Sequence, residues 1–293
     1  MKRVALVSSR TWFRKSREDQ GLEAALCSAG IQAEILCWED SVPWQQYDLV
    51  ILRSPWDYYL QYEAFRLWLV SLQEQGVNLA NGVDRVLNNI SKTTQLEQLK
   101  RCEIQPIPSY VCRSEETVYT WLTRTDCRRF VVKPDVSTSG HNTFLIDMDG
   151  SSGKCSAAIT KILSEGRVAI VQPFIPEVND GELSLIYFLG SFSHAVLRHP
   201  GVLADKKHPE PVRPEIRYRE AGDRICSFLG GQELLYARVD LVGYHGRIHI
   251  MEVELAEPDL YLTLDYPSVE IRPIDTFVRC ILKLLDCQNG GNR

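Results

Sequence analysis

The stretch YARVDLVGYHGRIHIMEVELAEP, residues 236–258, constrains the fold of this chain more than any other. Two runs in it alternate apolar and polar residues, as half-buried β-strands do, and glycines lie between the runs, which predicts a hairpin. Side chains two residues apart in a strand point to the same face, which Glu252 and Glu254 therefore share. Asp240 joins them if it lies opposite Glu252, a register that we expect from a turn with an odd number of residues.

Three carboxylates on one face repel one another unless a cation lies among them. Oxygen ligands suit a hard cation, and Mg²⁺ is the usual one where phosphates complete its coordination. Arg238, a cation beside the acids, also fits a site for phosphate and metal. The opposite face of the hairpin is predicted to be apolar, with Val239, Leu241, Met251, Val253 and Leu255. The alternative is an acidic edge exposed to solvent.

Composition narrows the class of protein. At 293 residues the chain is near the size at which one core gives way to two or more domains. A net charge of −5 argues against a general attraction to nucleic acid or anionic membranes, and neither a membrane span nor a signal peptide is recognisable. The nine cysteines lack CxxC spacing, so we expect no disulfide framework, no zinc site and a location in the reducing cytoplasm. Several are interpreted as small core residues, namely Cys37, Cys112, Cys226 and Cys280.

The first part of the chain alternates strands and helices. The predicted order is strand 2–8, helix 18–29, strand 32–38, strand 48–53 and helix 63–75. This alternation favours a parallel α/β unit, whose ligands bind beyond the carboxyl ends of the strands. Arg53 and Trp56 follow the third strand, where Arg53 could clamp a carboxylate and Trp56 could wall a pocket. A proline-containing turn with a packed tryptophan is the alternative.

A lysine and a loop of small residues follow in the middle of the chain. The strand predicted at 130–134 carries Lys133, and a strand is predicted again at 144–147. The loop between them holds Ser137, Thr138, Ser139 and Gly140. Small residues let backbone N–H groups turn toward an anion, so we expect a flexible anion-binding loop, with an ordinary hairpin tip as the alternative. It is not a Walker loop, because the lysine precedes the small residues.

The remaining elements are also mixed. Helices are predicted at 91–102, 156–164, 220–229 and 275–285, and strands at 168–174, 181–190 and 193–198. Ser91 is the expected cap of the first of these helices. The segment 199–214, which contains Lys206 and Lys207, is interpreted either as a mobile lid or as a solvated loop.

In their order along the chain, these features resemble the ATP-grasp superfamily. The matching set is Lys92, Lys133 with the STSG loop, VQPF, GELSL, RVD and MEVELAEP. The resemblance implies an α/β and α+β fold in which a Rossmann-like N-terminal domain precedes two α+β subdomains that enclose ATP. The corresponding ranges are 1–88, 89–174 and 175–293. The residues themselves place the first boundary between Asn81 and Lys92.

The resemblance also implies roles for individual residues. Nucleotide contacts are implied for Lys92, Lys133, the STSG loop, the backbone of Gln172, Phe174 and Ile175 over the adenine, and Glu182 at the ribose. Asp240, Glu252 and Glu254 would hold Mg²⁺. Glu254 stands where related ligases commonly have Asn, and its extra negative charge could favour a second Mg²⁺.

A closer resemblance, to the ATP-grasp cyclase of D-cycloserine biosynthesis and its relatives, is carried by WEDSVPW, ILRSPW, FVVKP, SHA and MEVELAEPDLYLTL. Where those relatives often have Lys, this chain has Arg198, and we expect Arg238 and Arg198 to act on the transferring phosphoryl group. Arg53, Trp56, Arg213 and Arg217 are expected to face the substrate. The implied activity is an ADP-forming carboxylate–amine ligase acting on a small amino-acid-like molecule, with a homodimer left possible. Intramolecular cyclisation and a non-catalytic ATP-binding module are the alternatives.

Overall fold

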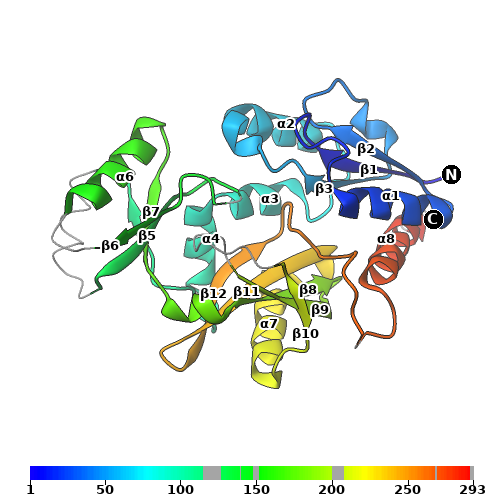
Figure 1. Ribbon diagram of the computed structural model, residues 1–293. Helices are drawn as coiled ribbons and strands as arrows, with labels where there is room; N and C mark the ends of the chain where they lie inside the picture. The colour runs from blue at the N-terminus through cyan, green and yellow to red at the C-terminus, as the bar shows by residue number, and fades with distance from the viewer. Residues whose placement is uncertain (115–126, 139, 148–151, 200–207, 268, 291–293) are drawn as a thin grey trace.

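The computed structural model describes residues 1–114, 127–138, 140–147, 152–199, 208–267 and 269–290, and its strands form three sheets. Figure 1 shows the N-terminal sheet beside the C-terminal helix, with the middle sheet at the far side of the molecule. Both parallel and antiparallel sheets carry helices, so the mixed α/β and α+β class expected from the sequence is confirmed. None of the helices in the described ranges is long and apolar enough to cross a membrane.

The N-terminal sheet is parallel, with the strand order β2-β1-β3. Its strands are β1 (Arg3–Ser8), β2 (Gln32–Cys37) and β3 (Leu49–Ser54), and its helices are α1 (Arg17–Ser28) and α2 (Tyr62–Glu74). Alternate residues of β1 enter two different cores, because successive side chains point to opposite faces. Val4 and Leu6 face α1, whereas Ala5 and Val7 face α2. The sheet is therefore covered on both sides, as expected for a parallel α/β unit.

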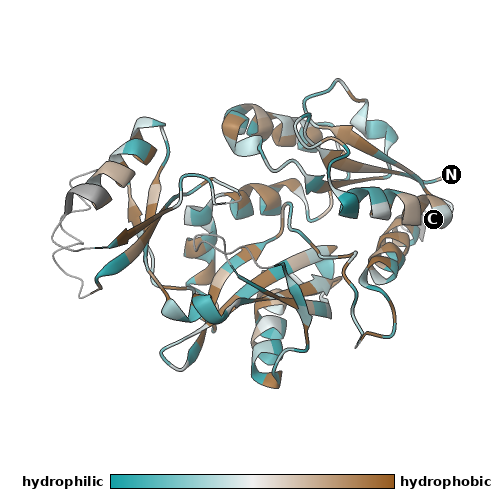
Figure 2. Ribbon diagram, in the orientation of Figure 1, coloured by the Kyte–Doolittle hydropathy of each residue, from teal (hydrophilic) through white to brown (hydrophobic). Residues whose placement is uncertain are grey.

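The C-terminal helix α8 (Pro273–Gly290) returns to this first sheet. Phe277, Ile281 and Leu285 share a core with the α1 face of β1, and Phe188 of the third sheet joins them. Figure 2 shows the hydrophobic residues along α8 and the strands beside it. This core lies between the first and third sheets, so the predicted division at residue 88 crosses a continuous apolar contact. The division into three domains remains a prediction.

Two short helices connect the first sheet to the second, α3 (Val83–Ile90) and α4 (Lys92–Leu99). Sequence reasoning missed α3, although its buried residues Val83, Val86 and Ile90 recur at helical spacing. Ser91 caps α4 as predicted, since its hydroxyl accepts from the Thr94 N–H.

The middle sheet is antiparallel, with the order β4-β7-β5-β6. Its strands are β4 (Tyr110–Cys112), β5 (Arg129–Pro134), β6 (Phe144–Asp147) and β7 (Ala169–Pro173), and α6 (Ser152–Ser164) packs on it. The third sheet is also antiparallel, with the order β10-β9-β8-β11-β12. Its strands are β8 (Glu182–Phe188), β9 (Ser191–Arg198), β10 (Glu210–Val212), β11 (Tyr236–Tyr244) and β12 (Arg247–Glu254), with α7 (Ile216–Leu229) against them.

Strand β10 corrects one expectation. It pairs with β9 inside the segment 199–214, which the sequence predicts to be a lid or a solvated loop. Lys206 and Lys207 of the same segment lie outside the described residues. The cysteine interpretation holds for Cys37, Cys112 and Cys226, which are buried, whereas Cys280 is half-buried.

The β11–β12 hairpin has the predicted register by a different route. Asp240 lies opposite Glu252, but the turn between Tyr244 and Arg247 has two residues, so the prediction of an odd turn was wrong. A β-bulge shifts the register of the two strands by one residue instead. Leu241 pairs with Ile250 and Asp240 pairs with Glu252, so Met251 is the extra residue of the bulge.

The bulge also changes the face on which Met251 lies, because one extra residue reverses the alternation. Met251 does not join the buried side of the hairpin with Val239 and Val253, as the pattern predicted. It is half-buried against Ile107 and Ile175 instead.

Candidate active site

A cleft of about 1020 Å³ lies between the middle and third sheets. It is lined from one side by residues of β5, β6 and β7 and from the other by residues of β11 and β12. The segments after β1 and β3 close one end with Trp12 and Trp56. Its size is at the upper end of the range for ligand pockets, so it has room for a large ligand or for two smaller ones.

The predicted carboxylates meet at the floor of this cleft, which Glu252 and Glu254 line while Asp240 lies buried beneath it. One oxygen from each of Asp240, Glu252 and Glu254 lies within 4.8 Å of the others. Asp240 is fully buried, and the two glutamates are half-buried. An all-oxygen set of this size fits a hard divalent cation such as Mg²⁺.

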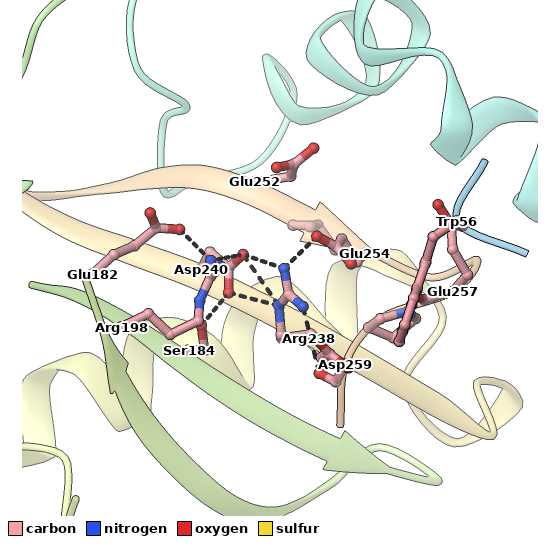
Figure 3. A network of polar contacts seen from close by, with 12 residues as sticks. Trp56, Glu182, Ser184, Arg198, Arg238, Asp240, Glu252, Glu254, Glu257 and Asp259 are labelled. Atoms are coloured by element: carbon pink, nitrogen blue, oxygen red, sulfur yellow. Dashed lines mark hydrogen bonds and ion pairs between the residues drawn. The ribbon is translucent and has the colours of Figure 1, made fainter. Parts of the chain in front are cut away.

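Two arginines are interleaved with these acids (Figure 3). Asp240 accepts hydrogen bonds from Ser184 Oγ at 2.6 Å, from Arg198 Nη2 at 2.7 Å and from Arg238 Nε and Nη2, each at 3.0 Å. Arg238 also pairs with Glu254. The acids are therefore compensated by guanidinium groups, and the mutual repulsion inferred from sequence is only part of the electrostatics.

The two glutamates titrate in opposite directions. Burial raises the pKa of Glu254 to about 8, against the lowering effect of Arg238. Burial also acts to raise the pKa of Glu252, but Lys92 and Lys133 outweigh it and lower that pKa to about 2. One carboxylate is thus held ionised by lysines, while burial shifts the pKa of its neighbour upward.

The lysines enter the cleft from different elements. Lys92, at the start of α4, places Nζ 3.1 Å from Glu252 Oε1 and donates to the Ser137 carbonyl at 2.9 Å. Lys133, near the end of β5, lines the same cleft. Burial lowers the pKa of Lys133, and Glu252 opposes that effect.

The loop after β5 lies over the lysines. Ser137, Thr138 and Gly140 line the cleft, and Ser139 lies outside the described residues. The Thr138 hydroxyl donates to the Trp56 carbonyl, which ties this loop to the N-terminal sheet. Gly140 has a φ of 72°, a conformation that favours glycine.

The segment after β7 forms an apolar wall. Gln172, Phe174 and Ile175 all line the cleft, as predicted residues of one site. Ile175 packs with Ile107 and Met251, and the three make a surface suited to a flat heterocycle. The Phe174 N–H donates to the Arg129 carbonyl at 2.8 Å, so it is already used within the sheet.

Glu182 also lines the cleft, but its carboxylate is engaged. Arg198 Nη2 lies 2.7 Å from Glu182 Oε1 and 2.7 Å from Asp240 Oδ2. Burial raises the pKa of Glu182 to about 7, although Arg198 opposes the shift. Arg198 thus connects a predicted ribose contact to a predicted metal ligand.

Three of the four predicted substrate residues are placed elsewhere. Arg53 is only 1% exposed and pairs with Glu18 and Asp19, so it clamps carboxylates of its own chain. Arg213 and Arg217 are exposed and are not among the residues that line the cleft. Sequence spacing could not separate these arginines from cleft residues, because only the packing of α1 on the sheet buries the end of β3.

Trp56 does line the cleft, with partners that the sequence did not reveal. Its indole N–H donates to the Glu257 carbonyl at 3.0 Å, and its ring meets Trp12 edge-to-face at 5.0 Å. Sequence reasoning missed several residues at this end, namely Trp12, Tyr58, Glu257, Asp259 and Tyr261. The only signal for the last three was their position directly after the Glu252–Glu254 pair.

Solved structures of similar shape define the fold. D-alanine–D-alanine ligase from Bacillus anthracis complexed with ATP superposes with a TM-score of 0.72 at 12% identity, covering 100% of both chains. D-cycloserine synthetase DcsG superposes with a TM-score of 0.84 at 23% identity, covering 97% of this chain and 99% of that one. The fold of this chain is therefore the ATP-grasp fold.

Sequence comparison is more specific. Residues 4–81 match the family described as D-cycloserine synthetase DcsG, N-terminal domain. The cycloserine biosynthesis protein DcsG of Streptomyces lavendulae is 27% identical over 283 residues, which is 89% of this chain and 93% of that protein. The chain is therefore similar to DcsG in sequence as well as in fold.

Proposed function

We propose that this enzyme is an ADP-forming ligase that joins a carboxylate to an amine on small amino-acid-like substrates. The observation that carries the proposal is the cluster on the cleft floor, where Arg238 lies among Asp240, Glu252 and Glu254. Phosphoryl transfer needs positioning and charge neutralisation more than covalent chemistry, and this cluster supplies both. The ATP-grasp fold supports ATP as the phosphoryl donor.

The nucleotide would lie along the cleft. Ile107, Ile175 and Met251 offer an apolar surface for the adenine, and Glu182 is the candidate for the ribose. Lys92 and Lys133 are the candidates for the phosphates. Among the described residues, the Lys133 side chain has no hydrogen-bond or ion-pair partner, which leaves its ammonium group available for a phosphate.

Mg²⁺, held by Asp240, Glu252 and Glu254, would neutralise charge on the phosphates. We propose two ions, because Glu254 supplies a third full carboxylate beside Asp240 and Glu252. Arg238 is the candidate for stabilising the transferring phosphoryl group, and Arg198 is the second.

In the proposed reaction a substrate carboxylate oxygen attacks the terminal phosphorus of ATP, and ADP leaves. The amine nitrogen then attacks the acyl carbon, the C–O bond to phosphate breaks, and the nitrogen loses a proton to water. The products are an amide, ADP and phosphate. The nine free cysteines take no part in these steps and fit a reducing, ATP-containing cytoplasm.

A second candidate is intramolecular ring closure, in which one molecule carries both the carboxylate and the amine. The 27% identity with the cycloserine biosynthesis protein across 89% of the chain favours it. A phosphate-release assay distinguishes the two, with amino acids, dipeptides and ureido or aminooxy amino acids supplied singly and in pairs. Turnover that requires two different compounds excludes cyclisation, and a ring product from one compound excludes the intermolecular ligase.

A non-catalytic ATP-binding module is the remaining alternative. The complete carboxylate set argues against it, since a module has no need of metal ligands. Binding of ATP without phosphate release across the whole panel would contradict the proposed ligase.

A further inference from the structure

One segment beyond the metal carboxylates is held in an unusual way. In residues 256–261, here called the clamped segment, six consecutive backbone carbonyls accept hydrogen bonds from side chains. The donors, in order along the segment, are Tyr236, Trp56, Arg53, Arg238, His194 and Tyr266. The distances range from 2.7 Å for the first to 3.4 Å for the two arginines.

The amide side of the clamped segment is fixed as well. Glu18 accepts from the Leu260 N–H at 3.2 Å and from the Leu262 N–H at 2.8 Å. Tyr261 has a φ of 54°, in the left-handed region where a tyrosine is strained. Strain of this kind persists only where the surroundings enforce it, and here contacts from the N-terminal sheet and the third sheet do so.

This clamping aims alternate side chains into the cleft. Pro258 and Leu260 are buried beneath the segment, whereas Glu257, Asp259 and Tyr261 line the cleft. Figure 3 shows Glu257 beside Trp56, with Asp259 near Arg238. A recognition site works best when its side chains are presented by rigid backbone, and the clamped segment meets that requirement.

The carboxylates of the clamped segment differ from those at the cleft floor in whether they have a cationic partner. Glu182, Asp240, Glu252 and Glu254 each have a cationic partner in the cleft. Glu257 and Asp259 have no ion pair among the described residues. The Glu257 carboxylate meets the hydroxyl of Tyr58, and burial raises its pKa to about 7. Two carboxylates therefore stand in a ligand-sized cleft without a cation of their own.

The surroundings of these carboxylates are aromatic. Trp12, Trp56 and Tyr261 line the same end of the cleft, and the two indoles lie 5.0 Å apart. Carboxylates beside aromatic faces favour an organic ammonium group, which gains both an ion pair and cation–π attraction. A hydrated metal ion gains little from indole rings.

We propose that Glu257 and Asp259, walled by the aromatic residues, bind the ammonium group of the substrate. This inference rests on the proposed ligase function and specifies its substrate class. The substrate is a small molecule with a free primary ammonium group at one end and the carboxylate to be phosphorylated at the other, beside Arg238. Arg53 is a positioning residue for this subsite, because it holds the Pro258 carbonyl and, through Glu18, the Leu260 and Leu262 amides.

The test measures binding separately from turnover. The probes are D- and L-amino acids and ureido or aminooxy amino acids, each paired with its N-acetyl derivative, and binding is followed by ligand-observed NMR with Mg-ADP present and absent. Wild type is expected to bind at least one free amine and to bind its N-acetyl form at least tenfold more weakly. Asp259→Asn and Glu257→Gln are each expected to weaken free-amine binding by about tenfold or more.

Asp265→Asn is the matched control, because Asp265 is an exposed carboxylate close in sequence that does not line the cleft. Its amine affinity and the Mg-ADP affinity of all three variants should equal those of wild type. Equal binding of the N-acetyl forms, unchanged affinity in Asp259→Asn and Glu257→Gln, or no binding by any free amine would overturn the subsite. Amine binding without ATP consumption would count against the ligase function alone.

Discussion

Replacing Asp240 by alanine distinguishes two accounts of the carboxylate cluster. If repulsion among three acids dominates, as the sequence pattern suggested, removing one charge should leave stability unchanged or raise it. The structure predicts the opposite, because Asp240 is fully buried and accepts from both Arg198 and Arg238. Asp240→Ala leaves the buried guanidinium group of Arg238 and the half-buried one of Arg198 without their shared partner.

The magnitude follows from the contacts. Removing one partner of a buried ion pair costs about 3–5 kcal/mol. Each arginine keeps one other carboxylate, Glu182 for Arg198 and Glu254 for Arg238, so we expect the lower end, about 3 kcal/mol. Glu252→Gln should cost about 1 kcal/mol, because its pair with Lys92 is more open to water.

The assay is thermal unfolding without Mg²⁺ or nucleotide, so that metal binding does not contribute. At roughly 2 °C per kcal/mol for a chain of this size, Asp240→Ala should lower Tm by about 6 °C and Glu252→Gln by about 2 °C. Asp265→Ala, an exposed carboxylate outside the cleft, is the control and should change Tm little. Both cleft variants should lose turnover. An Asp240→Ala protein as stable as wild type would refute the compensated-cluster reasoning.

Three further predictions test other parts of the molecule. Glu254→Asn should retain some turnover but bind one Mg²⁺ fewer in the presence of ADP, by isothermal titration calorimetry, and unchanged stoichiometry would contradict the two-ion proposal. Arg53→Met should lower the free energy of unfolding by about 3 kcal/mol or more, because it removes the ion-pair partner of Glu18 and Asp19. If Arg53 contacted the substrate instead, this variant would show a raised KM at unchanged stability. Burial lowers the pKa of His194 to about 4, so the unfolded chain binds more protons between about pH 6.5 and 4, and stability should fall as pH falls through that range. His194→Gln should show a smaller loss of Tm over the same range, and parallel curves would exclude His194 as the cause.

Much of the site was predictable because its signals are local. Glu252 and Glu254 share a face by strand periodicity alone, and Lys133 follows from its place at the end of an apolar strand. The parallel N-terminal unit followed from alternating strands and helices, and the cap at Ser91 from residue type. Each of these depends on neighbours within one element, which the sequence displays directly.

The register of the metal hairpin was not local in this sense. With a two-residue turn and no bulge, Asp240 would lie opposite Met251. Only the bulge at Met251 places Glu252 opposite Asp240 and on the same face. The chain pattern around Met251 is compatible with a regular strand, so the bulge is a property of the paired sheet. Its consequence is functional, because it moves Met251 from the core to the wall of the cleft.

The sequence by itself determined which chemical groups this protein carries, and in which order: the lysines, the arginine and the carboxylates of the candidate site. The tertiary structure decided which of its other charged residues face the cleft. Arg53 is buried while Asp259 is exposed to the cleft, although each stands at or beyond the end of an apolar strand. The physical reason is distance along the chain, since Arg53 reaches the Pro258 carbonyl across 205 residues. Hydrogen bonds over such separations form only after the sheets have packed, and no local pattern records them.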